Sequence, residues 1–228
     1  MNLTAADIRY ILMAVFVLLI SVAIHEFGHA FMAYKLGDDT PKRQGRVTLN
    51  PLAHADLIGT LLLPLFGNLH AAAGGGGGGF GWGKPVQWQP HKIRRGISMS
   101  LANILVSFAG PFMNLLLATL VALAHVILVT QDVIAIDGQA SQVVLPFIVR
   151  TNFILFFFNL LPVPPLDGGH IAQAFMPYKH RAAFDNYARF GPFIILGVML
   201  IPQIRQVFAV PAYWCTDLVY KAFVAIFT

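Results

Sequence analysis

The sequence predicts an all-α protein that crosses a membrane several times, and three observations support this fold class. Hydrophobic residues make up 57% of the 228 residues and charged residues 11%, against about 45–50% and about 25% in soluble domains. The mean hydropathy is +0.69, so too few polar side chains are present to cover a water-facing surface. Several long apolar segments alternate with short polar loops. These features exclude an ordinary cytosolic enzyme and a disordered chain, and a single cysteine excludes a disulfide scaffold.

The apolar segments predict five membrane spans within a single domain over residues 1–228. The first begins with an apolar run at 11–20 that could also be the core of a signal peptide. We favour an uncleaved span, because cleavage would separate this run from the polar cluster beside it. No repeat and no separate soluble domain is evident. The predicted spans cover about residues 8–36, 97–129, 143–161, 190–204 and 208–228.

Three segments between the first two spans have distinct patterns. Residues 46–50 alternate like a short strand ended by Pro51, which we expect to pair with an extended substrate. Residues 57–69 are apolar but too short to span, which predicts a re-entrant or interfacial piece. Residues 71–83 contain six consecutive glycines, which predicts a flexible loop. This loop ends like a phosphate-binding motif, but Pro85 follows it, so no nucleotide is expected.

The distribution of basic residues predicts the orientation in the membrane. Loops 35–56, 84–95 and 177–189 are basic, whereas residues 131–142 contain no basic residue. Because positive loops stay on the cytoplasmic side, the N-terminus is predicted outside a cell membrane. The same loops account for the net charge of +5, so the lipid bilayer is the expected partner and nucleic acid is not.

The sequence His25-Glu-Phe-Gly-His29 in the first span matches the pattern H-E-x-x-H. Residues four apart share one face of a helix, so both imidazoles can bind one zinc ion with Glu26 beside it. The protein contains one glutamate and eight histidines, so this match is expected by chance about once in a thousand shuffled sequences. The alternative is a polar patch inside the helix bundle. Each charged group in an apolar helix costs about 2–3.5 kcal/mol, which favours a functional site.

Two histidines leave zinc at least one protein ligand short. A second glutamate is excluded, and the longer motif H-E-x-x-H-x-x-G-x-x-H fails at Met32 and Lys35. Among the remaining Asp, His and Cys residues we favour Asp167. It follows an apolar span, lies between prolines and glycines that permit a tight turn, and has about the depth of the histidine pair in the cytoplasmic half of the bilayer. A helix-capping role for Asp167, and Cys215 as the ligand, are the alternatives.

The H-E-x-x-H motif, with Asn159-Leu-Leu-Pro-Val-Pro-Pro-Leu-Asp-Gly-Gly169, closely resembles the site-2 protease family of intramembrane zinc metalloproteases. The resemblance covers about residues 20–175, and further matching segments of bacterial and archaeal members lie at 45–51, 80–85 and 109–114. It implies a three-helix catalytic core with flanking transmembrane helices. No PDZ module fits between the spans, and the polyglycine run departs from the family.

The resemblance also implies a ligand set and an activity. His25, His29 and Asp167 would hold one zinc ion per chain, and Glu26 would act as general base. The implied reaction is hydrolysis of peptide bonds within or next to transmembrane segments of membrane proteins, as in regulated intramembrane proteolysis.

Two asparagines are candidates for binding substrate or stabilising the oxyanion, namely Asn159 and Asn114. The alternative for each is an interhelical hydrogen bond. Among the other histidines, His54 and His170 are weaker candidates for supporting the site. Two other functions are possible: a zinc transporter, for which ionisable residues should recur along a path, and a non-catalytic membrane chaperone. Ionisable residues at one depth argue against the transporter, and an intact Glu26 argues against the chaperone.

Overall fold

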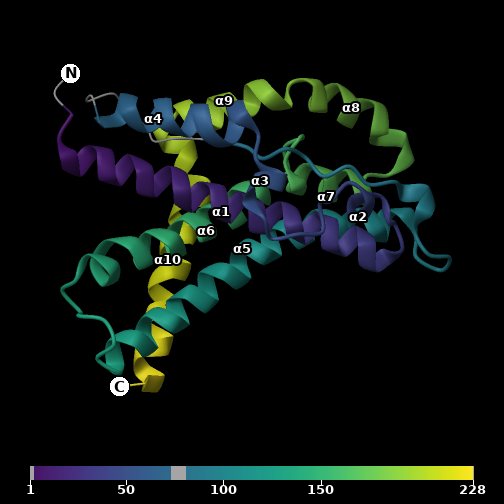
Figure 1. The fold of residues 1–228 in the computed structure, drawn as a ribbon. Helices are drawn as coiled ribbons and strands as arrows, with labels where there is room; N and C mark the ends of the chain where they lie inside the picture. Colours follow the sequence, from purple (N-terminus) through teal and green to yellow (C-terminus); the bar gives the residue numbers. More distant parts are fainter. Residues whose placement is uncertain (1–2, 73–80, 228) are drawn as a thin grey trace. The chain divides into compact units, whose positions relative to one another are not determined.

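The computed structural model describes residues 3–72 and 81–227. Among these residues the secondary structure is helical and no strand occurs, which confirms the all-α class. The chain divides into two compact units, Met1–Arg95 and Gly96–Thr228, whose helices are labelled in Figure 1. The six glycines of the predicted flexible loop, at 74–79, lie outside the described residues. The expectation of one domain stays a prediction.

The first unit is organised around α1 (Ala5–Leu36). Thr4 begins this helix with a capping box, in which its hydroxyl accepts from the Asp7 amide and the Asp7 carboxylate accepts from the Thr4 amide. Gly37 ends it in a left-handed conformation with φ of 113°. At 32 residues the helix is about 48 Å long, enough to cross a bilayer core of about 30 Å.

Short helices pack on α1 and complete the first unit (Figure 1). The segment predicted to be re-entrant is helical and too short to span, and its position in the membrane stays a prediction. In order, the short elements are α2 (Thr40–Arg43), α3 (Pro51–His54), the π-helix η1 (Leu57–Leu62), α4 (Leu63–Ala72) and the 3₁₀-helix η2 (Pro90–Lys92).

The strand predicted at residues 46–50 is wrong. This segment is irregular, and its backbone groups bond locally instead of forming a ladder. The Thr48 carbonyl accepts from the His54 ring at 2.9 Å, the Asn50 amide donates to the Thr48 hydroxyl, and the Asn50 side chain caps α3. Polar side chains that bond nearby backbone compete with sheet formation in this way. The expected edge pairing with a substrate strand therefore has no strand to support it.

The second unit consists of three long helices and several shorter ones. Helices α5, α6 and α10 contact one another, and their core is formed by Ala118, Ala122, Val149, Phe153 and Ala212. The elements are α5 (Met99–Thr130), the π-helix η3 (Ala140–Val144), α6 (Leu145–Asn159), α7 (Asp167–Phe175), the 3₁₀-helix η4 (Tyr178–His180), α8 (Arg181–Arg189), α9 (Gly191–Leu200) and α10 (Pro202–Phe227).

Three helices of the described chain are long and apolar enough to cross a membrane, namely Ala5–Leu36, Met99–Thr130 and Ser141–Asn159. They match the first three predicted spans. The last two predicted spans, 190–204 and 208–228, differ from the structure. Helices α9 and α10 meet at a bend of 83° and together supply at most one further membrane span. Helix α9 is only about 15 Å long. Ile201 precedes Pro202 and is extended, as residues before proline prefer, so the helix breaks there.

Buried polar contacts join helices of the second unit. Asn114 of α5 donates to the side chain of Asn152 in α6 at 2.8 Å, and both residues are fully buried. His125 of α5 lies 2.9 Å from the hydroxyl of Ser141 through Nε2 and 2.9 Å from that of Tyr220 through Nδ1. Such contacts satisfy polar groups that hydrocarbon would leave unpaired.

Candidate metal centre and active site

The two histidines of the H-E-x-x-H motif lie on one face of α1, one turn apart. Their Nε2 atoms are 3.0 Å from each other, and the rings meet edge to face with centroids 4.7 Å apart. His25 is buried, and His29 and Glu26 are half-buried. The helical spacing of four residues thus directs both imidazoles to one point, as predicted from the sequence.

Asp167 is the first residue of α7 and comes from the second unit. The preceding loop contains Pro162, Pro164 and Pro165, which end the helical path of α6. Gly168 and Gly169 follow, and both approach backbone closely. A Cβ atom on Gly168 would lie 2.3 Å from the Leu160 carbonyl oxygen, and one on Gly169 2.4 Å from the nitrogen of Pro164. Only glycine fits these two positions, so the glycines determine where Asp167 begins its helix.

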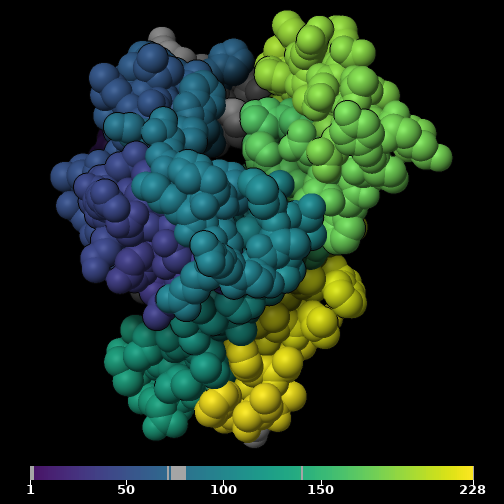
Figure 2. Space-filling view, turned by 90° about the vertical axis from the view of Figure 1, so that its right-hand side faces the viewer, coloured from purple at the N-terminus to yellow at the C-terminus, as the bar shows by residue number. Residues whose placement is uncertain are grey.

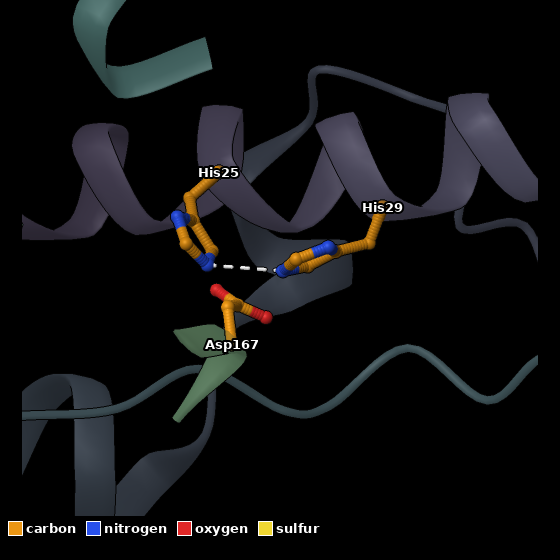
Figure 3. Close-up of side chains that lie close together, drawn as sticks. All are labelled: His25, His29 and Asp167. Carbon is orange, nitrogen blue, oxygen red and sulfur yellow. Dashed lines mark hydrogen bonds between the residues drawn. The ribbon is translucent and has the colours of Figure 1, made fainter. Parts of the chain in front are cut away.

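His25, His29 and Asp167 form the candidate metal group, to which each residue offers one ligand atom (Figure 3). This donor set fits zinc. Two nitrogens bound to a tetrahedral zinc at about 2.0–2.1 Å lie about 3.3 Å apart, close to the 3.0 Å between the two Nε2 atoms. Two imidazoles and one carboxylate are also typical of catalytic zinc sites, because they leave a coordination position open.

Backbone of the first unit lies directly against Glu26. A Cβ atom on the buried Gly83 would lie 2.6 Å from Cγ1 of Val22, 3.2 Å from Cγ of Glu26 and 3.4 Å from its Oε1. The segment around Gly83 is attached at both sides, since the Trp82 amide donates to the Gly59 carbonyl at 3.1 Å and the Lys84 amide to the His54 carbonyl at 2.9 Å. Gly83 therefore lets this backbone segment lie against Glu26, because a side chain at position 83 would crowd Val22 and Glu26.

Arg46 holds the segment around Gly83 to helix α3. Its side chain is 5% exposed, and its guanidinium donates to the carbonyls of Ala53, Lys84 and Pro85, the last at 2.9 Å. Burial lowers the pKa of Arg46, and the charge of Glu26 acts in the opposite direction. Arg46 is thus a buried cation whose hydrogen-bond partners are backbone carbonyls, with a smaller electrostatic contribution from Glu26.

His54 packs beside these groups and is only 1% exposed. Its Nε2 donates to the Thr48 carbonyl at 2.9 Å, and its Nδ1 is buried without a hydrogen-bond partner among the described residues. Burial lowers the pKa of His54, so the neutral ring is favoured at neutral pH. His54 is a fixed, neutral histidine in the same unit as Glu26, whereas His170 of α7 is exposed.

The two asparagine candidates differ in their surroundings. Asn114 is fully buried and donates to Asn152, which is the interhelical hydrogen bond weighed as its alternative. Asn159 is half-buried at the end of α6, and its amide donates to the Leu155 carbonyl one turn earlier at 2.9 Å. Cys215 lies in α10 and is not a member of the candidate metal group. Substrate or oxyanion contacts of either asparagine stay predictions.

Sequence reasoning missed the contributions of Arg46 and Gly83. Arg46 lies in the segment interpreted as a strand, and Gly83 in the motif that resembles a phosphate-binding loop. The available signal was a basic residue, Arg46, at the start of a segment that alternates between apolar and polar side chains. This segment is followed by Pro51 and His54, which belong to α3.

Comparison with known proteins places these features in a family. The sequence profile described as "Peptidase family M50" matches residues 122–201. The chain is 36% identical over 217 residues to "Putative zinc metalloprotease YwhC" of Bacillus subtilis, covering 93% of this chain and 91% of that protein. It is 32% and 30% identical to the proteins named "Putative zinc metalloprotease Rip2" of Mycobacterium tuberculosis and Mycolicibacterium smegmatis, covering 71% of each. No solved structure matches significantly.

Proposed function

We propose that this chain, which belongs to peptidase family M50, cleaves peptide bonds within or next to transmembrane segments of membrane proteins. Its relatives are named zinc metalloproteases, so zinc-dependent peptide hydrolysis is the activity of the family to which it belongs. The observation that carries the finer proposal is the place of the motif. His25 and Glu26 lie about twenty residues into a 32-residue apolar helix, so a substrate must reach them at membrane depth.

The proposed mechanism assigns a role to each side chain of the site. His25, His29 and Asp167 would hold zinc, which when bound would act as a Lewis acid and make water nucleophilic at neutral pH. Glu26 accepts the proton of the attacking water and donates it to the leaving amine. Arg46 anchors the segment around Gly83, and Gly83 brings backbone against the Glu26 side chain. Asn159 is proposed to orient the substrate near the end of α6.

The proposed location is a cell membrane, with the active site in the cytoplasmic half and the N-terminus outside. The support is the basic character of residues 35–56, 84–95 and 177–189. In the first unit the motif is nearer to the end of α1 that leads into the first of these loops, since eleven residues separate Glu26 from Gly37. Regulated intramembrane proteolysis is the biological process that this location suggests.

The test is cleavage of a panel of single-span membrane peptides by the purified full chain with zinc, compared with Glu26→Gln. Glutamine has nearly the same size but accepts no proton, so turnover should fall about 10²–10⁴-fold. Zinc content should remain that of the wild type, because the ligands are unchanged. Cleavage products that map outside the membrane segments would contradict the proposed substrate, and near-normal turnover by the variant would contradict the role of Glu26. Zinc transport across vesicles by the wild type, without peptide hydrolysis, would favour the transporter instead.

A further inference from the structure

The loop that carries Asp167 has few hydrogen bonds of its own. Three of the residues between α6 and α7 are prolines, which lack an amide proton. Within the loop, the Val163 amide donates to the Leu161 carbonyl and the Leu166 amide to the Val163 carbonyl. The carbonyls of Pro162 and Pro164 are instead contacted from another part of the second unit. The position of this loop therefore depends on residues outside it.

That other part is the junction of α8 and α9, which Figure 2 shows in yellow-green as one continuous stretch of surface. The Tyr187 hydroxyl in α8 donates to the Pro162 carbonyl at 3.1 Å. Gly191, the buried first residue of α9, lies against Pro164 so closely that a Cβ atom would be 1.7 Å from the Pro164 carbonyl oxygen. Pro164 is thus contacted by Gly169 of α7 and by Gly191 of α9.

We infer that the α8–α9 junction positions Asp167, with Gly191 and Tyr187 as positioning residues; the inference rests on the proposed zinc-binding role of Asp167. A side chain at 191 must move Pro164 or α9 by more than about 1 Å, since real Cβ contacts shorter than 3.0 Å essentially never occur. Metal ligands tolerate displacements of only about 0.2 Å from ideal distances. Only two residues separate Pro164 from Asp167, so a shift of Pro164 is expected to displace the carboxylate.

The junction also has the composition of a membrane-surface element. Helix α8 carries basic residues at both ends, and Phe184 is its buried residue. Large apolar side chains on either side are exposed, among them Phe175, Tyr178, Phe190 and Phe193. Aromatic and basic residues together favour the bilayer interface. The composition of the junction thus suits a location at the bilayer interface.

The experiment compares Gly191→Ala with Gly197→Ala in the purified full chain. Both replace a glycine of α9 with alanine, but a Cβ atom at 197 meets nothing within 4 Å. Zinc affinity is measured by competition with a chromogenic chelator, and folding by the melting temperature of the zinc-free protein. Gly191→Ala should weaken zinc binding about 10–100-fold, as changes beside metal ligands do, while Gly197→Ala binds as the wild type. Wild-type affinity in a folded Gly191→Ala protein would overturn the inference.

A milder pair covers the case in which Gly191→Ala fails to fold. Tyr187→Phe removes only the hydroxyl that bonds Pro162, and Tyr178→Phe is the matched control at a residue 87% exposed. Zinc affinity should fall about threefold to tenfold in the first and not in the second; equal affinity in both contradicts the inference. Asp167→Ala separates the two hypotheses. If Asp167→Ala binds zinc normally, the assignment of Asp167 as a ligand fails. If Asp167→Ala loses zinc while Gly191→Ala and Tyr187→Phe retain wild-type affinity, only the positioning role of the junction fails.

Discussion

The buried guanidinium of Arg46 gives a quantitative prediction about the loops beside Glu26. Replacing Arg46 with Gln removes at least two of its three hydrogen bonds to the carbonyls of Ala53, Lys84 and Pro85. A hydrogen bond from a charged donor contributes about 1.5–3 kcal/mol. Part of this gain is offset because the variant no longer buries a guanidinium. The net loss should be about 3 kcal/mol, or about 10²-fold in the equilibrium for local opening.

Hydrogen exchange of two amides measures this opening. The Lys84 amide donates to the His54 carbonyl and the Trp82 amide to the Gly59 carbonyl, so both are protected only while the segments stay together. In Arg46→Gln both should exchange about 10²-fold faster. The matched control is Arg43→Gln, because the Arg43 side chain is 70% exposed and, within the described part of the chain, bonds only the surface carboxylate of Asp39. Unchanged exchange in Arg46→Gln, or equal acceleration in Arg43→Gln, would refute the proposal that Arg46 holds these segments together.

Three further predictions concern the site. Asp167→Ala should cut zinc content measured by elemental analysis, whereas Cys215→Ser should not; retained zinc in the first would return the ligand search to the histidines and cysteine. Gly83→Ala should reduce kcat/KM about tenfold or more while zinc stays bound, because its Cβ would crowd Val22 and the Glu26 side chain; unchanged hydrolysis would show that the segment around Gly83 moves aside without disturbing Glu26. Burial lowers the pKa of His54 from 6.5, so the unfolded chain binds that proton more readily and stability falls as pH drops below about 6.5. His54→Asn should flatten the melting temperature of the zinc-free protein between about pH 5.5 and 7.5, and an unaltered slope would exclude this contribution.

The parts of the fold predicted correctly are those encoded locally. The apolar length of α1 and the spacing of His25 and His29 are properties of one helix, and both appear as expected. The assignment of Asp167 as a ligand stays a prediction; it rests on prolines that restrict the backbone and glycines that permit a tight turn. The sequence interpretation failed where distant groups decide. The segment at 46–50 alternates like a strand, but its hydrogen bonds go to side chains such as His54.

Long-range contacts also explain what was not predicted at all. Nothing adjacent to Arg46 in the sequence indicates that its guanidinium bonds residues 84 and 85. Gly191 begins a short apolar helix and resembles any other helix-starting glycine until the carbonyl of Pro164 is placed against it. Both residues owe their importance to backbone carbonyls from elsewhere in the chain, and carbonyl positions have no signature in side-chain patterns.

The hydrogen bond between Asn114 and Asn152 has a consequence for biogenesis. The two asparagines lie near the middle of α5 and α6, and 38 residues separate them along the chain. During synthesis α5 therefore leaves the ribosome well before the partner of its central amide exists. Because a polar amide facing lipid tails is unfavourable, we expect α5 to remain beside the insertion machinery until α6 arrives. The two helices would then enter the bilayer together as a hairpin, joined by residues 131–139, with the amide pair closing as translation proceeds.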